Sequence, residues 1–147
     1  MNLLLDTHIF LWAVEDHPNL SEAAREAIVA GDNVVFVSAA TAWEIAIKRG
    51  LGKLDVPRGN YIEELKLHRF TPLDIKTEHA LAVESLPPHH KDPFDRLLIA
   101  QAQIEQLTLI TRDPCQITPA NVPPIYGNRV PPVYGHDVPA ARTISHR

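Results

Sequence analysis

The chain has 147 residues, of which 45% are hydrophobic, so its length and composition allow one domain with a substantial core and argue against global disorder. Its net charge of −4 argues against a generally basic nucleic-acid-coating protein, and its single cysteine excludes an internal disulfide. No apolar stretch approaches the roughly 18 residues of a membrane-spanning helix. The N-terminus lacks a basic segment and Asp6 interrupts its short apolar run, so we expect no signal peptide and a cytoplasmic protein without membrane contact.

Short apolar segments alternate with longer helical ones from the N-terminus to about residue 111. In chain order, we expect strands at 2–5, 34–37, 70–73 and 108–111, and helices at 9–14, 22–30, 38–49, 58–69, 77–85 and 93–106. This alternation predicts an α/β protein of three layers, in which helices cover both faces of a central parallel sheet. Ligands of such sheets bind beyond the carboxyl ends of the strands.

The composition changes after Asp113. Seven of the 13 prolines lie in residues 114–147, and VPPIYG at 122–127 recurs as VPPVYG at 130–135. Two copies are too few for a repeat architecture. We therefore expect a last edge strand near 122–126, a single domain covering residues 1–127, and a proline-rich, polyproline-like tail at 128–147 that contributes little to catalysis.

Four acidic residues stand where predicted strands end or predicted helices begin. They are Asp6, Glu44, Asp95 and Asp113. In a parallel α/β fold such positions converge on one edge of the sheet, and carboxylates held close together repel one another unless a cation screens them. The pattern therefore predicts a divalent metal site and metal-dependent phosphoryl chemistry. With these four acids on a metal, the remaining 14 acidic residues balance the 14 lysines and arginines, so the net charge is no objection to a nucleic-acid substrate.

Two of these acids also have ordinary structural explanations in the first half of the chain. Asp6 could simply cap the helix that follows it. Glu44 could form a surface ion pair with Lys48, four residues later on the same helix. The helix around Glu44 is apolar on most sides, however, so we expect it to be largely buried and its acid to need a partner.

The acids in the second half of the chain have comparable alternatives. Asp92 precedes Pro93 and is a good helix N-cap, so a structural role is the leading interpretation for it. Asp95 would then lie in the first turn, where it could merely interact with the helix dipole, although the apolar sequence after it predicts an internal helix. Asp113 precedes Pro114 and could belong to an ordinary turn.

Four segments of the chain together resemble the PIN-domain nucleases, and within them the VapC-type toxins of bacterial toxin–antitoxin pairs. These are LLLDTHIFLWA at 3–13, VSAATAWEIAIKRGLGKL at 37–54, HHKDPFDRLLIAQAQ at 89–103 and LTLITRDP at 107–114. The resemblance covers residues 1 to about 115, and the long proline-rich end departs from it. It implies a Mg²⁺ or Mn²⁺ site formed by Asp6, Glu44, Asp95 and Asp113. The supporting residues that it implies are Thr7, Ser38, Asp92 and Thr111.

The expected reaction is metal-assisted hydrolysis of RNA phosphodiesters, with Asp6 and Asp113 as principal ligands and with Glu44 and Asp95 acting through water. Phosphate contacts are expected from basic residues near the acids, namely Lys48, Arg49, Lys53, Arg96 and Arg112. Ordinary solvated charge is the alternative for these residues, and an internal ion pair is a further one for Arg96.

The resemblance also implies a cognate antitoxin and a homodimer. Two other functions stay open at this stage. A non-catalytic binding module could keep the PIN fold, and a phosphatase could use Asp6 as a covalent nucleophile. The phosphatase is disfavoured because such enzymes carry a second aspartate two residues later, where this chain has His8.

Overall fold

The computed structural model of the protein describes residues 1–54, 60–86 and 92–111. The strands in this part of the chain are β1 (Asn2–Leu5), β2 (Val34–Ser38), β3 (Thr71–Leu73) and β4 (Thr108–Ile110). The helices are α1 (Thr7–Glu15), α2 (Glu22–Val29), α3 (Ala39–Gly50), α4 (Tyr61–Leu67), α5 (Thr77–Ala82) and α6 (Pro93–Ile104), with a 3₁₀ turn η1 at Val83–Ser85.

The four strands form one parallel sheet in the order β3-β2-β1-β4. Strand β1 lies in the middle, where Leu5 pairs with Val37 of β2 and with Ile110 of β4. The chain moves from β1 to β2 and β3 on one side, and returns to place β4 on the other side of β1. The order of the strands therefore reverses beside β1, and this is where ligands of open α/β sheets bind.

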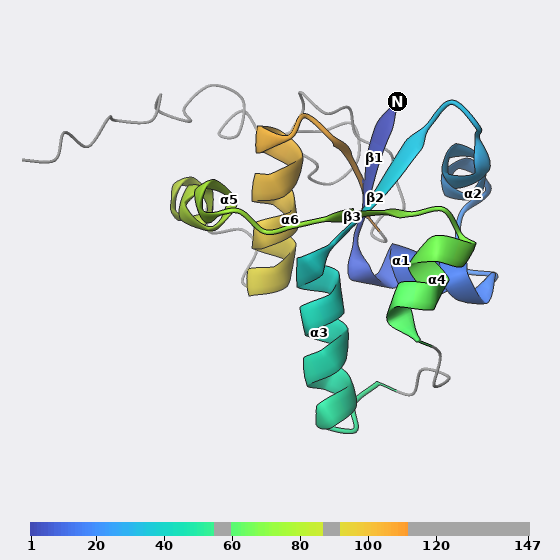
Figure 1. Ribbon diagram of the computed structural model, residues 1–147, viewed down its shortest axis with the longest axis horizontal. Coiled ribbons are helices and arrows are strands. Elements are labelled where there is room, and N and C mark those ends of the chain that lie inside the picture. Colours follow the sequence, from blue (N-terminus) through green and yellow to red (C-terminus); the bar gives the residue numbers. More distant parts are fainter. Residues whose placement is uncertain (55–59, 87–91, 112–147) are drawn as a thin grey trace, which may run out of the picture.

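Alternate side chains of β1 enter two separate cores. Leu3 and Leu5 pack in a cluster with residues of α1, α2 and α4, whereas Leu4 packs against α6 and the start of α3. Figure 1 shows the same division, with α1, α2 and α4 on one side of the strands and α5 and α6 on the other. The predicted three-layer α/β/α fold with a central parallel sheet is confirmed.

The predicted elements differ from the observed ones mainly at their ends. The helix expected at 77–85 stops at Ala82 and tightens into η1. The helix expected at 58–69 is observed at Tyr61–Leu67, and its first two predicted residues lie outside the described part. The strand expected near 122–126 and the tail at 128–147 also lie outside it. None of the helices in the described ranges has both the length and the apolar character needed to cross a membrane.

The prediction that α3 is largely buried is wrong. Trp43, Ile47 and Leu51 are spaced four residues apart along α3 and its end, and their exposed fractions are 57%, 37% and 63%. The reason is that α3 projects from the end of β2 beyond the sheet (Figure 1), so the body of the protein covers only one of its faces. Glu44 and Ile45 lie on that covered face.

Candidate active site at the carboxyl edge of the sheet

Strand β1 delivers Asp6 to the carboxyl edge of the sheet. The Asp6 N–H donates to the carbonyl oxygen of Ile110 at 3.0 Å, which continues the pairing of β1 with β4 by one residue. The Asp6 Oδ1 accepts a 2.8 Å hydrogen bond from the N–H of Ile9 and caps α1. Only 8% of Asp6 is exposed. Asp6 is therefore both a helix cap and a buried carboxylate at the point where the strand order reverses.

Glu44 is held from two directions on the covered face of α3. Its exposed fraction is 4%. Thr7, the first residue of α1, donates from Oγ1 to Glu44 Oε1 at 2.7 Å, and Lys48 Nζ lies 2.5 Å from Glu44 Oε2. The ion pair with Lys48 thus exists, but the carboxylate in it is buried rather than on the surface. Because Thr7 follows Asp6 directly, this contact ties Glu44 to the end of β1.

Ser38 fixes the start of the helix that carries Glu44. It is fully buried at the end of β2, and its Oγ accepts from the N–H of Ala40 at 3.0 Å and caps α3. The same hydroxyl donates to Gln101 Oε1 of α6 at 2.5 Å. Gln101 was not among the residues predicted from the sequence, where its one signal is a polar residue inside the apolar run of a predicted internal helix.

The acids of α6 lie in and before its first turn. The Asp92 Oδ1 accepts from the N–H groups of Phe94 and Asp95, at 2.8 and 3.2 Å, so Asp92 caps α6. Asp95 is exposed in the first turn. Thr111 is half-buried directly after β4, and Asp113 lies outside the described residues. Between residues 1 and 111, apart from the two gaps, no three of the predicted acids have ligand oxygens within 4.8 Å of one another.

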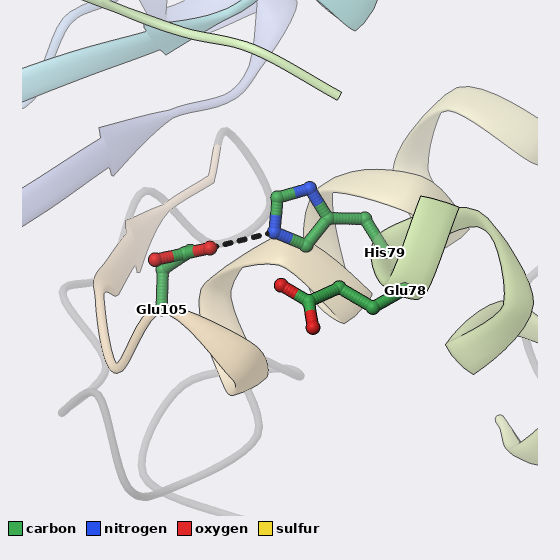
Figure 2. A group of neighbouring side chains, drawn as sticks. All are labelled: Glu78, His79 and Glu105. Atoms are coloured by element: carbon green, nitrogen blue, oxygen red, sulfur yellow. Dashed lines mark hydrogen bonds and ion pairs between the residues drawn. The ribbon is translucent and has the colours of Figure 1, made fainter. Parts of the chain in front are cut away.

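The described ranges hold one compact group of possible metal ligands, and it lies elsewhere. Figure 2 shows Glu78 and His79 of α5 beside Glu105 at the end of α6, with ligand atoms within 4.8 Å of one another. His79 Nδ1 accepts from the N–H of Lys76 at 3.0 Å, so the ring proton is on Nε2, which donates to Glu105 Oε1 at 2.8 Å. A metal on Nε2 would have to displace that proton.

Positive charge is already present at this second group. Lys76 Nζ lies 3.4 Å from Glu105 Oε1. The hydrogen bond from His79, with the nearby Lys76 charge, lowers the pKa of Glu105 despite its partial burial. The group therefore fits a satisfied hydrogen-bond network better than a metal site.

The basic residues expected to contact phosphate lie in different settings. Lys48 is paired with Glu44, and Arg49 and Lys53 are exposed at the far end of α3. Arg96 donates from Nη2 to the carbonyl oxygens of Val83 and Leu86, at 2.9 and 3.1 Å, and so binds the end of η1 to α6. Arg112 lies outside the described residues.

The sequence matches the PIN domain family model over residues 3–117, so the chain belongs to the PIN domain family. Domains of this family are generally nucleases. Among solved structures, the chain is similar to one in the crystal structure of VapBC2 from Rickettsia felis bound to a DNA fragment from their promoter. The TM-score is 0.55 at 21% sequence identity, over 76% of this chain and 87% of that one. No curated protein matches the sequence.

Proposed function

We propose that the protein is a metal-dependent endoribonuclease of the VapC type and the toxin of a type II toxin–antitoxin pair. One observation carries the proposal. Two nearly inaccessible carboxylates, Asp6 and Glu44, are tied together through Thr7 at the carboxyl edge of a parallel sheet in a PIN-domain chain. Burial of a carboxylate costs free energy that its hydrogen bonds and ion pairs only offset, so two buried carboxylates at this edge of the sheet favour a chemical role.

The donor set fits a hard divalent cation, because Mg²⁺ and Mn²⁺ prefer carboxylate oxygen. Asp6 and Asp113 are the proposed principal ligands, and Glu44 and Asp95 are proposed to act through water. When bound, such a cation lowers the pKa of a water molecule and stabilises charge on the phosphoryl oxygens. Among the described residues, Thr7 orients Glu44, and Ser38 and Asp92 fix the starts of the helices that carry Glu44 and Asp95.

Substrate phosphates are proposed to contact the exposed cations at the end of α3 and the cations near the other acids. Arg49 and Lys53 have this position, and Arg112 follows β4 in the sequence. Residues 39–54 carry three cationic residues and one acid, the buried Glu44. This segment therefore has a net positive charge, as expected for a surface that binds a polyanion. Such contacts hold the backbone of the RNA without reading its sequence.

A cognate antitoxin and a homodimer complete the proposal, in a cytoplasmic setting. The structural neighbour is part of a VapBC2 complex, which supports an antitoxin partner. The exposed stripe of Trp43, Ile47 and Leu51 supports self-association, because large apolar side chains that share one helix face are typical of protein contacts. Sedimentation of wild type and Trp43→Glu tests the homodimer. A monomeric wild type would exclude it and leave the stripe to the antitoxin.

The decisive experiment is RNA cleavage by wild type and Asp6→Asn, with Mg²⁺ or Mn²⁺ and with EDTA. Asparagine caps helices as well as aspartate does, so Asp6→Asn removes the charge and keeps the cap of α1. We expect wild type to give internal cuts with 5′-phosphate ends, and both EDTA and the substitution to abolish them. Cleavage that survives EDTA and leaves cyclic phosphates would exclude the metal mechanism. A folded wild type that cleaves no RNA would favour the binding module.

A further inference from the structure

Both oxygens of the Glu44 carboxylate are bound within the chain. Thr7 occupies Oε1 at 2.7 Å and Lys48 occupies Oε2 at 2.5 Å. The two partners differ in kind. Thr7 supplies a neutral hydrogen bond, whereas Lys48 supplies the positive charge that a carboxylate with 4% exposure needs.

The side chain of Lys48 is much more exposed than that of Glu44. The Glu44 side chain is enclosed, but the Lys48 side chain is 37% exposed at the start of the last turn of α3. A lysine carries its charge on a flexible four-carbon stem, so the ammonium can leave Glu44 and move into solvent by rotating side-chain bonds. The next residue, Arg49, is exposed and has the same charge, which makes it a matched reference for effects of net charge alone.

We propose that Lys48 is a place-holding cation of the candidate metal site, meaning that its ammonium takes the place of the divalent cation beside Glu44 when no metal is bound. This inference rests on the proposed function. In the metal-free protein its ammonium pairs with Glu44 Oε2 and holds the carboxylate in place. When a divalent cation is bound at the site, the Lys48 ammonium moves away from Glu44 into solvent, because two cations close to one buried carboxylate repel each other. Lys48 is thus a positioning residue for Glu44, in contrast to the phosphate contact expected for it from the sequence.

The first test is thermal unfolding of metal-free protein. Lys48→Met leaves Glu44 buried without its cation, so we expect the Tm to fall by about 5–10 °C, while Arg49→Met changes it by less than about 2 °C. Lys48→Arg keeps the charge and should retain most of the stability. In the double variant Lys48→Met with Glu44→Gln no uncompensated charge remains, so much of the lost Tm should return.

The second test is calorimetric titration of the same proteins with Mg²⁺ and Mn²⁺, without RNA. Removal of the competing ammonium should make Lys48→Met bind the divalent cation roughly three- to tenfold more tightly than wild type, and Mg²⁺ should raise its Tm by more. Arg49→Met should resemble wild type in both measurements.

Three results would each overturn the place-holding role: unchanged metal affinity in Lys48→Met, weaker affinity in that variant, or a metal-free Tm equal to that of Arg49→Met. Failure of the proposed function looks different. In that case wild type itself neither binds Mg²⁺ or Mn²⁺ nor cleaves RNA, whatever the Tm of Lys48→Met.

Discussion

Ser38 and Gln101 form a 2.5 Å hydrogen bond between two fully buried side chains that are 63 residues apart in the sequence. The bond joins the β2–α3 junction to the C-terminal half of α6. The Gln101 amide continues the connection, because its Nε2 donates to the carbonyl oxygen of Asp74 and lies 3.3 Å from His79 Nδ1. The buried Gln101 amide of α6, the helix that carries Asp95, is therefore bonded to the start of α3, the helix that carries Glu44.

We predict that Gln101→Leu lowers the free energy of unfolding by about 2–4 kcal/mol, because leucine removes the acceptor of the buried Ser38 hydroxyl proton and the side-chain donor to the Asp74 carbonyl. Urea denaturation measures this loss. Gln103→Leu, on the same helix and half-buried, is the matched control and should change the free energy by less than about 0.5 kcal/mol. Equal losses in the two variants would show that the network does not stabilise the fold.

Glu105 should make the stability of the folded protein depend on pH in the acidic range. The hydrogen bond from His79 lowers the Glu105 pKa below its usual value of 4.5 in the folded protein. The contribution of a depressed carboxyl pKa to stability is complete above the unfolded-state pKa, and it is lost as the pH falls through the folded-state pKa. We therefore expect the Tm of wild type to fall more between pH 5 and about pH 3 than that of Glu105→Gln.

The comparison with Glu105→Gln is informative because glutamine can still accept the proton of His79 Nε2 but does not titrate. Glu78→Gln removes an exposed acid from the same group and should follow the wild-type curve. Parallel pH curves for wild type and Glu105→Gln would contradict the assignment of this linkage to Glu105.

Local patterns in the sequence were sufficient to predict the fold. The β-branched and apolar runs of β1 and β2 alternate with helices that begin at Asp6, Ser38 and Asp92, and these residues do cap helices in the structure. Cap chemistry depends on a few neighbouring residues, so it can be recognised without knowledge of the tertiary structure.

The exposure of a side chain and the identity of its hydrogen-bond partner depend on contacts between residues distant in the sequence, and these could not be predicted from local patterns. The apolar composition of α3 predicted burial, but burial depends on whether another element covers a face, and nothing in the described part covers Trp43 and Ile47 fully. The partner of Ser38 lies 63 residues away, and no local pattern pairs Gln101 with it. The approach of Glu44 to the end of β1 followed from the parallel topology, but its contact with Thr7 did not.

We predict that Arg96→Met destabilises the protein by about 1–3 kcal/mol, because its guanidinium donates to two carbonyl oxygens at the end of η1. Chemical denaturation measures the loss. Arg49→Met should behave in the opposite way, with unchanged stability but weaker RNA binding and a smaller dependence of binding on salt. An Arg96→Met variant of wild-type stability with much weaker RNA binding would instead assign Arg96 to phosphate contact.

Substitutions of Asp92 and Asp95, the two acids at the start of α6, should have different effects on stability and on RNA cleavage. Asp92 caps the helix through Oδ1, and asparagine caps equally well. Asp92→Asn should therefore keep the free energy of unfolding of wild type, and its rate of RNA cleavage should stay within a few-fold of the wild-type rate. Asp92→Ala should lose about 1 kcal/mol of stability with the cap. Asp95→Asn should keep its stability but lose at least about 100-fold in kcat under the proposed mechanism, since its charge serves the metal site. Single-turnover cleavage alongside denaturation distinguishes the variants, and equal inactivity of Asp92→Asn and Asp95→Asn would assign the Asp92 charge to the site as well.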